Sequence, residues 1–579
     1  MQSIDNIADA PSERQSDIIG QAGSIFRKCD ITGFLVDKKS ESLIRINAVL
    51  AVVSLLIGII GALLLLLTRW QEVHLLSQPW YYRMLNLHGM NALVFWLVFF
   101  EVAGLYFGST VVLNARMVAP KLGWVAFILM LVGFAMVNWK ILAGDADVMF
   151  TSYVPLKAHP LYYLGIILFA VGALIGCGIF FANLYVAKKE KKYGTSLPLF
   201  TYGLVAAGAI AVMTLLSGAM AYVPTFFWSL GLIENIDVSW YRVVWWGFGH
   251  SSQQINVTAM ISIWYLTVTL SVGGTSINEK VSRFAFMLYI LFISIASAHH
   301  LLVDPVVESD WKVWNTSYAM HLAVLASMIH AFAVPSAIES AQRRKGYVKS
   351  MFDWLKNAPW SNPAFSAVAI AIIGFGFLGG ISGVVFGMEQ TNIIVHNTIA
   401  ITGHFKGTVV IGTTLTFMGI TYYLIPLIFR RKIVGFGLAK YQPWMFGIGI
   451  ALVSVGMMAI GMLGVPRRVY DATFAGGPFT HDFNPIIGLL WTITAVGGIL
   501  AFVGALVWIL IVVVSVFFGP KVESASDMQV PISPMAPDVH LKSKYEAPGT
   551  LVLALIFMLA FLVFFYLNWK WLAAIWEIK

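Results

Sequence analysis

Long apolar runs alternate with short polar connections along most of the chain. A helix of about 20 apolar residues crosses the hydrocarbon core of a bilayer, and thirteen of the runs reach that length. We expect membrane spans at about 46–68, 84–113, 122–143, 159–187, 198–228, 239–274, 282–303, 313–336, 363–388, 391–429, 441–464, 484–518 and 550–568. The pattern predicts an all-α, polytopic membrane helix bundle of about 13 transmembrane helices.

Two polar segments divide the chain. Residues 1–44 are polar and mixed in charge, and residues 519–548 are rich in proline, serine and charge. We therefore expect a cytoplasmic N-terminal tail at 1–44, a twelve-helix core at 45–518, a cytoplasmic linker at 519–548 and a C-terminal thirteenth transmembrane helix at 549–579.

Basic loops alternate with acidic or mixed loops. Lys188 to Lys192, Arg343 to Lys345 and Arg430 to Lys432 are basic, whereas Glu234 and Asp237 mark an acidic loop. Cytoplasmic loops carry an excess of lysine and arginine, so we place the N-terminus in the cytoplasm and, with an odd number of spans, the C-terminus outside. We expect an integral protein of the cytoplasmic (inner) membrane, embedded in the lipid bilayer. These loops account for the formal charge of +9, so no nucleic-acid partner is expected.

Composition supports a membrane protein and limits its cysteine chemistry. The chain is 59% hydrophobic and 11% charged. Its two cysteines, Cys29 and Cys177, lie far apart in the sequence and so suggest neither a disulfide framework nor a paired-thiolate copper centre within this chain.

Ionisable side chains lie inside the predicted spans, where each is costly unless it has a partner. His404 and Lys406 lie about a dozen residues into the run 391–429, near the predicted middle of the bilayer. Side chains two positions apart on a helix point about 200° away from each other, so these two should contact different neighbours.

Five histidines on four predicted spans share the outer half of the membrane: His88, His250, His299, His300 and His404. A single buried histidine more often has a structural role. Five at one depth instead favour metal binding, because neutral imidazole is the commonest metal ligand and unpaired burial of the ring is costly.

These histidines belong to motifs that follow one another along the chain: Leu87-His-Gly89, Trp245-Trp-Gly-Phe-Gly-His250, His299-His300 with Asp304-Pro305, Gly403-His-Phe405 and Val465-Pro-Arg-Arg468. With these motifs, the chain resembles the catalytic subunit (subunit I) of the heme-copper oxidase superfamily, closest to its B-type branch. The resemblance implies two hemes, one low-spin and one high-spin, and a non-heme metal facing the high-spin heme.

The resemblance also implies the ligands. His404 would be the proximal ligand of the high-spin heme, and His88 one axial ligand of the low-spin heme. His250, His299 and His300 would hold the second metal, with copper favoured and iron possible.

A basic pair breaks the charge pattern of the predicted outer loops. In the family, Arg467 and Arg468 would bind heme propionates, with His396 nearby as a propionate or water-network partner. The alternative for the arginine pair is a solvated outer loop.

The chain departs from the oxidases four residues after the first metal histidine. Oxidases place a tyrosine there that supplies an electron and a proton, whereas this chain has Gln254. Glutamine cannot supply that electron, and the better known nitric oxide reductases carry glutamate at this position. We therefore favour an atypical nitric oxide reductase, which forms nitrous oxide. The alternative is a B-type terminal oxidase (cytochrome c oxidase), which reduces O₂ to water with a relocated tyrosine. Tyr265 is the candidate for that tyrosine or for a proton-path hydroxyl, although such tyrosines often serve only packing.

A second departure lies two residues after the proximal histidine, where the family has a histidine and this chain has Lys406. A neutral lysine amine would complete a low-spin heme with His88. The alternative is a protonated Lys406, paired with an acid or a propionate, beside a five-coordinate heme.

Protons and electrons must also reach the site. Glu101, thirteen residues beyond His88, is a candidate proton relay, and His330 could contribute. We expect electrons from a small electron-donor subunit or from a soluble cytochrome c or cupredoxin on the outer side. A transporter or a heme-binding sensor would also bury polar residues, but adjacent histidines with an arginine pair are not expected of a transporter.

Overall fold

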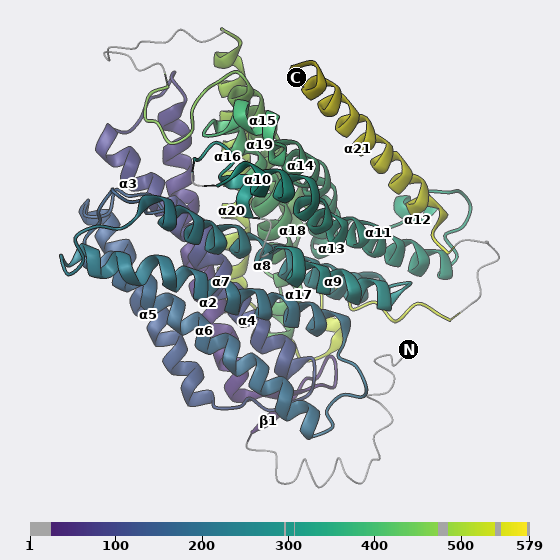
Figure 1. The fold of residues 1–579 in the computed structure, drawn as a ribbon. Helices are drawn as coiled ribbons and strands as arrows, with labels where there is room; N and C mark the ends of the chain where they lie inside the picture. Colours follow the sequence, from purple (N-terminus) through teal and green to yellow (C-terminus); the bar gives the residue numbers. More distant parts are fainter. Residues whose placement is uncertain (1–24, 294–296, 306, 473–484, 539–545, 576–579) are drawn as a thin grey trace.

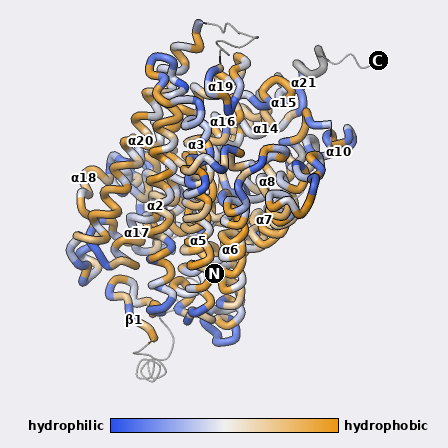
Figure 2. The backbone as a smooth tube through the Cα atoms, turned by 90° about the vertical axis from the view of Figure 1, so that its left-hand side faces the viewer, coloured by the Kyte–Doolittle hydropathy of each residue, from blue (hydrophilic) through white to orange (hydrophobic). Residues whose placement is uncertain are grey.

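The computed structural model describes residues 25–293, 297–305, 307–472, 485–538 and 546–575. They form a bundle of long packed helices with one small two-stranded sheet (Figure 1). Hydrophobic positions fill the middle of the helices, and hydrophilic positions gather toward both ends of the bundle (Figure 2). The predicted all-α membrane helix bundle is confirmed.

The elements have the following bounds: β1 Phe26–Lys28, β2 Leu35–Asp37, α2 Lys38–Arg69, α3 Gln78–Gly89, η2 Met90–Phe95, α4 Trp96–Tyr106, η3 Phe107–Val111, α5 Pro120–Ala143, α6 Pro160–Lys189, α7 Leu199–Ser229, α8 Val238–Val272, α9 Glu279–Ile293, η4 Ser297–His300, α10 Ser309–Trp314, η5 Asn315–Ala319, α11 Met320–Arg344, α12 Asp353–Lys356, α13 Pro363–Gly374, η6 Phe375–Ile381, α14 Ser382–Gly387, α15 Glu389–Val395, α16 Ile399–Phe405, η7 Lys406–Thr414, α17 Leu415–Leu424, η8 Ile425–Phe429, α18 Phe436–Ala439, α19 Gln442–Met462, α20 Ile486–Phe518, η9 Ala525–Asp527 and α21 Pro548–Ile575.

In the described part of the chain, eleven helices are long and apolar enough to cross a membrane. The two other predicted spans are also helical. α9 ends at Ile293, and the predicted remainder of its span lies partly outside the described residues, followed by the 3₁₀ turn η4. α21 extends over 28 residues, with its apolar part at Pro548–Val563.

The span predicted at 391–429 is present at Ile399–Phe429, but the chain breaks before Ile399, so the predicted start of this span was wrong. α15 ends at Val395, and α16 begins only at Ile399. Asn397 between them has a φ of 60°, a left-handed conformation that asparagine tolerates and that a continuous helix excludes. His404 is therefore the sixth residue of its helix and lies nearer the helix start than we predicted.

Two π-helical stretches lie next to the candidate heme ligands. η2 follows His88 after one residue, and η7 begins at Lys406. A π-helical stretch inserts an extra residue and changes the face on which the following side chains lie, and such stretches are frequent at functional sites.

Close helix packing sets the position of the segment that carries His404. Gly403 lies so near α19 that an added Cβ would be 2.7 Å from the backbone nitrogen of Met458. Ser454 of α19 donates a hydrogen bond of 2.8 Å to the carbonyl of Gly403. Small residues allow membrane helices to approach this closely.

The N-terminal hairpin and the linker lie at one end of the bundle. Asp37 caps α2, which begins earlier than predicted because the carboxylate accepts hydrogen bonds from the first helical amides. Arg27 of β1 donates to the carbonyl of Leu427, and Lys432 of the same end pairs with Asp527 of the linker at 2.6 Å.

Candidate metal centre

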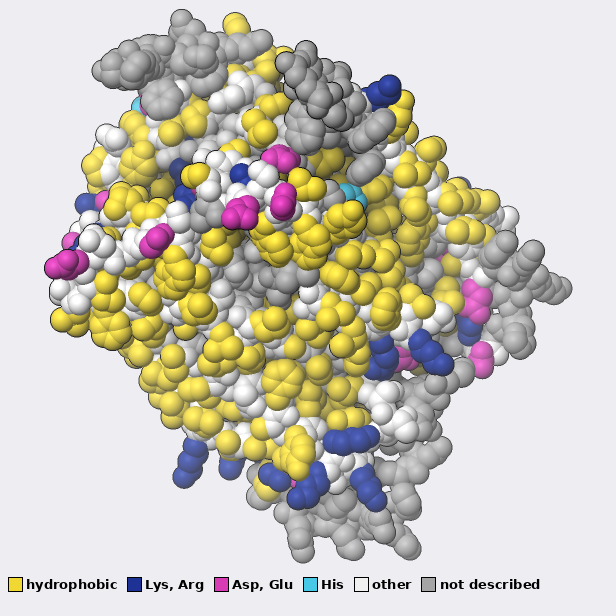
Figure 3. Space-filling view, in the orientation of Figure 1, with side chains coloured by type: hydrophobic (Ala, Val, Ile, Leu, Met, Phe, Trp, Pro, Cys, Tyr) yellow, Lys and Arg dark blue, Asp and Glu magenta, His cyan; other side chains and the backbone are white. Residues whose placement is uncertain are grey.

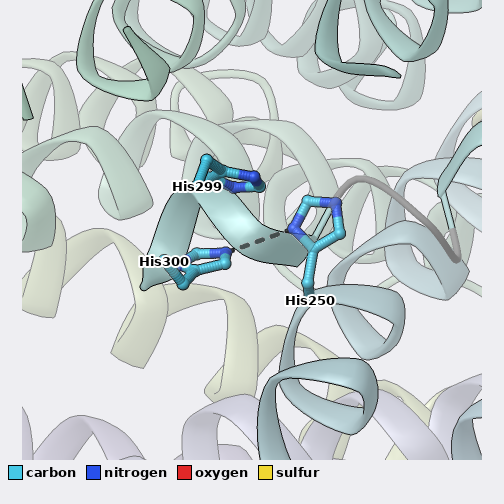
Figure 4. Close-up of side chains that lie close together, drawn as sticks. All are labelled: His250, His299 and His300. Carbon is cyan, nitrogen blue, oxygen red and sulfur yellow. Dashed lines mark hydrogen bonds between the residues drawn. The ribbon is translucent and has the colours of Figure 1, made fainter. Parts of the chain in front are cut away.

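Three imidazole rings converge where α8 meets η4 (Figure 4). His250 comes from α8, and His299 and His300 come from η4. One ring nitrogen from each histidine lies within 4.8 Å of the other two. Nδ1 of His250 is 3.2 Å from Nε2 of His300. The predicted grouping of these three histidines is therefore present in the structure.

The neighbours of these rings come from α8. Trp246 stacks on His300, with ring centroids 3.8 Å apart and planes 6° apart. The amide nitrogen of Gln254 is 3.5 Å from Nε2 of His250, because residues four apart share a helix face. Gln254 therefore lies beside His250.

The geometry of the three rings fits one transition-metal ion. A metal–imidazole bond is about 2.0 Å long, so nitrogens around one ion lie within about 4 Å of each other. Only a small inward movement of the rings is needed. A set of three neutral imidazoles suits copper or iron and leaves a coordination position open for a small molecule.

The surroundings of His404 expose one specific nitrogen of its ring. Nδ1 is 2.9 Å from the hydroxyl of Ser382 in α14, and that hydroxyl donates to the carbonyl of Leu378. The Ser382 oxygen therefore accepts the Nδ1–H of His404. The lone pair on Nε2 remains available for a metal, which is how partner groups orient ligating histidines.

His88 is oriented in the same way. Its Nδ1–H donates to the carbonyl of Gly58 in α2 at 2.9 Å, which leaves the lone pair on Nε2. Nζ of Lys406 lies 3.3 Å from that Nε2. Two nitrogens that bind one iron from opposite sides, at roughly 2 Å each, lie about 4 Å apart. The observed separation of the Lys406 and His88 nitrogens is shorter than this by less than about 1 Å. His404 and Lys406 thus contact different neighbours, as the sequence predicts.

One cavity of about 670 Å³ connects these groups. His88, His250 and His404 are all in its wall, with Lys406 and Gln254. Most of the other lining side chains are aliphatic or aromatic, which suits flat apolar cofactors. The donor set and the apolar walls therefore fit two hemes and a metal.

The wall of the cavity also contains Arg467 and Arg468, which follow α19. Arg467 donates to the side chain of Asn397 at 2.9 Å, and Arg468 lies 5.7 Å from the ring centre of Phe150. Two adjacent guanidinium groups at an apolar cavity suit carboxylate ligands such as propionates.

His396 occupies the break between α15 and α16, beside the arginine pair. Its Nδ1–H donates to the side-chain oxygen of Asn392 at 3.2 Å. Burial, and then the positive charge of Arg467, lower the pKa of His396 to about 4. His396 is therefore neutral at pH 7 and suits a hydrogen-bonding role better than a charged one.

Glu101 and Tyr265, which the sequence suggested for proton transfer, lie in different parts of the bundle. Glu101 of α4 is in the cavity wall, and its buried Oε1 has no hydrogen-bond partner in the described part of the protein. The hydroxyl of Tyr265 instead bonds to Ser282 at 3.0 Å and to Nδ1 of His330 at 3.0 Å, within a separate hydrophobic cluster. This position does not favour Tyr265 as a replacement for the tyrosine missing at Gln254.

Comparison with known proteins identifies the family of this chain. The sequence model of the family described as "Cytochrome C and Quinol oxidase polypeptide I" matches residues 43–500. This chain belongs to that family. It is 31% identical over 415 residues to cytochrome c oxidase subunit 1 of Thermus thermophilus, covering 70% of this chain and 72% of the relative.

Other oxidases of this family show the same likeness. Cytochrome c oxidase polypeptide 1 of Halobacterium salinarum is 24% identical over 480 residues, covering 78% of this chain and 73% of the relative. A solved heme-copper terminal oxidase dimer superposes with a TM-score of 0.79 and 25% identity, covering 90% of this chain and 92% of that one. The heme-copper oxidase subunit I fold is therefore confirmed. The relatives support the predicted alternative, an oxidase, and do not support the nitric oxide reductase that we favoured.

Sequence patterns missed several groups that orient the site, including Ser382, Gly58 and Trp246. Ser382 and Gly58 act through oxygens that no motif contains, and they lie in helices that precede those of His404 and His88 in the sequence. Trp246 lies within a quoted motif, but its contact with His300 depends on how α8 meets η4.

Proposed function

We propose that this chain is the catalytic subunit of a membrane terminal oxidase that reduces O₂ to water. The main support for this proposal is the cavity whose wall contains three clustered histidines, His404 and the His88–Lys406 pair. The oxidase names of the relatives favour O₂ as the substrate.

The ligands follow from the nitrogens that are free. His404 would bind the high-spin heme through Nε2, and His88 with Lys406 would bind the low-spin heme. His250, His299 and His300 would hold the non-heme metal, which we propose is copper, with iron as the alternative. The hemes and the non-heme metal, when present, would hold the diatomic substrate and pass electrons to it.

The side chains of this protein would orient the cofactors and supply protons. Arg467 and Arg468 would bind heme propionates, and neutral His396 would hydrogen-bond to a propionate or to water. Glu101 would carry protons, and Tyr265 with His330 would form a hydrogen-bonded proton path.

Electrons would enter from the outer side. We propose a small electron-donor subunit, or a soluble cytochrome c or cupredoxin, as the donor. The protein would lie in the cytoplasmic membrane, with the N-terminal tail and the linker in the cytoplasm and the C-terminus outside.

Reduction of nitric oxide to nitrous oxide is the second candidate, and Gln254 favours it. The amide of Gln254 lies beside His250, where an oxidase would have its tyrosine. Coupling of two NO molecules needs no oxidisable side chain at that position.

Parallel assays on the purified holoenzyme separate the two reactions. We expect rapid O₂ consumption, no nitrous oxide from NO, and one copper atom with two hemes by metal and heme analysis. The His300→Ala variant should lose the non-heme metal and turnover, whereas replacement of the exposed His74 by Ala should change neither. Nitrous oxide formation without O₂ consumption would select the second candidate, and consumption of neither gas would overturn both.

A further inference from the structure

The ring of His88 must keep a fixed direction to bind an iron through Nε2. The helix that carries it changes its geometry directly afterwards. α3 ends at Gly89, and in η2 the N–H of Trp96 donates to the carbonyl of Asn91, five residues earlier. Such a π-helical stretch inserts an extra residue, so the regular α-helical repeat alone does not fix how this segment lies against its neighbours. Contacts with other helices therefore set the position of His88.

Helix α2 holds one side of the segment. The carbonyl of Gly58 accepts the Nδ1–H of His88, and a Cβ added at Gly61 would lie 3.2 Å from Cβ of His88. A Cβ added at Gly58 would lie 3.0 Å from Cβ of Ala92 in η2. The two glycines let α2 approach closely, as small residues do between membrane helices. Contact with a single helix still allows the segment to rotate about its own axis.

A pair of asparagine amides joins the same segment to α5. Nδ2 of Asn91 donates to Oδ1 of Asn138 in α5 at 2.6 Å and to the carbonyl of Leu87 at 2.9 Å. Nδ2 of Asn138 donates to Oδ1 of Asn91 at 3.4 Å and to the carbonyl of Phe134 at 2.9 Å. Asn91 is fully buried, and Asn138 is 9% exposed. Every nitrogen and oxygen of the two amides thus has a partner inside the bundle.

These hydrogen bonds act directly beside His88. Leu87, whose carbonyl Asn91 holds, precedes His88 in the chain, and Asn91 follows His88 by three residues. His88 is in the wall of the cavity, whereas neither Asn91 nor Asn138 is among the described residues of that wall. The amide pair would therefore act on a heme through His88 and not by direct contact.

We propose that the amide pair of Asn91 and Asn138 positions His88 for binding to the low-spin heme iron. The inference rests on the function proposed above, in which His88 is an axial ligand. With α2 on one side and the amide pair on the other, Nε2 of His88 keeps its direction toward Lys406. Metal ligands have to be held to within about 0.5 Å and 10–20° of the productive geometry, and hydrogen bonds of the surrounding groups supply that precision. The core of a bilayer offers no water to replace such hydrogen bonds.

Electron paramagnetic resonance of the oxidised holoenzyme tests the proposal, because the g values of a low-spin heme depend on the orientation of its axial ligands. Asn138→Leu keeps a side chain of similar size but removes the acceptor for Asn91. We expect shifted g values. The midpoint potential of the low-spin heme should rise by about 59 mV for a tenfold loss of ferric over ferrous stabilisation.

Asn47→Leu is the matched control. Asn47 is a buried amide of α2 whose Nδ2 donates to Leu43 of its own helix at 2.8 Å, and whose Oδ1 has no partner among the described residues. The replacement makes the same chemical change in a membrane helix without removing a hydrogen bond to a second helix. It should change neither the g values nor the potential.

Two aspartate variants separate the specific hydrogen bonds from helix packing in general. Asn138→Asp keeps an oxygen that accepts from Asn91, so the g values and the potential of the wild type should be retained. Asn91→Asp removes the donor to Leu87 and to Asn138, so both measurements should shift as they do in Asn138→Leu.

Unchanged g values and potential in Asn138→Leu would overturn the proposal, even if that variant unfolds at a lower temperature, because the pair would then only join the two helices. Should Asn138→Leu fail to assemble its hemes, the two aspartate variants decide, and identical spectra in both reject the positioning role. A wild-type protein that consumes neither gas, but whose low-spin signal shifts in Asn138→Leu and is lost in His88→Ala, would refute the proposed reaction and leave the positioning of His88 in place.

Discussion

Lys406 and His88 approach each other from segments 318 positions apart in the sequence. A lysine amine can replace an imidazole as a heme ligand only when it is neutral, and burial and a metal both favour the neutral form. The structure points the amine at the free nitrogen of His88 and shows no ion pair of Lys406 with a described acid. Ligation by Lys406 therefore accounts for its position better than an ion pair does.

Replacement of Lys406 by Ala should convert the low-spin heme to a five-coordinate, high-spin heme, because one axial ligand is removed. The change would be complete in optical and electron paramagnetic resonance spectra. Lys406→His should restore a low-spin spectrum, and Thr408→Ala, at a second cavity-lining position of η7, should leave it unchanged. A low-spin spectrum that persists in Lys406→Ala would show that lysine is not the ligand.

Helix α21 is attached to the bundle through a buried ion pair at its first turn. Glu339 of α11 is fully buried and accepts a hydrogen bond of 2.7 Å from Arg343. The same carboxylate accepts from the amides of Gly549 at 2.9 Å and Thr550 at 2.6 Å, so it also caps α21. Figure 1 shows α21 diverging from the other helices beyond this point.

Glu339→Ala should destabilise the docking of α21 by about 3–5 kcal/mol, because it leaves Arg343 buried without its partner. Hydrogen exchange of the α21 amides in lipid nanodiscs measures the change. Glu279→Ala is the matched control, since Glu279 pairs with Arg283 at the same helical spacing but is 47% exposed. Loss of this exposed pair should change the free energy of docking by at most about 1 kcal/mol. Equal effects of the two replacements would contradict the role of the buried clamp.

Charge is distributed unevenly over the whole molecule. On the face shown in Figure 3, lysine and arginine side chains gather toward the lower end, while several acidic side chains lie in the upper part, with a broad hydrophobic surface between. This distribution agrees with the loop charges in the sequence. The assignment of the two ends to the sides of a membrane remains a prediction.

Cysteine labelling in sealed vesicles tests that assignment. Lys191→Cys should react only with a reagent on the cytoplasmic side, and Glu234→Cys only with one on the outer side. Lys191 follows the C-terminal end of α6 and Glu234 the C-terminal end of α7, and consecutive spans cross the membrane in opposite directions. The natural Cys29 and Cys177 are buried and should add little background. Labelling of both positions from one side would refute the predicted topology.

Much of the fold and of the site could be predicted from the sequence. Long apolar runs and intramembrane histidines are local signals, because a bilayer imposes a length on each span and a high cost on each ionisable group. The break at Asn397 was missed because the polar residues His396 to Thr398 are only a short interruption of a long apolar run, and its shape depends on backbone hydrogen bonds to Val465 and Arg467. The position of Tyr265, away from the cavity, also depends on distant partners, Ser282 and His330.

Apolar runs and short motifs were enough to predict a helical membrane protein that resembles the heme-copper oxidases, with histidines as its candidate ligands. The membrane helices follow from hydropathy, whereas the family follows from the resemblance of short motifs to those of its members. The arrangement of the helices shows that the histidines, Lys406 and Glu101 share one cavity, and which nitrogen of His88 and of His404 is free. Those features depend on contacts between helices far apart in the chain, where a shift of one turn would turn each side chain toward different neighbours while leaving the sequence pattern unchanged.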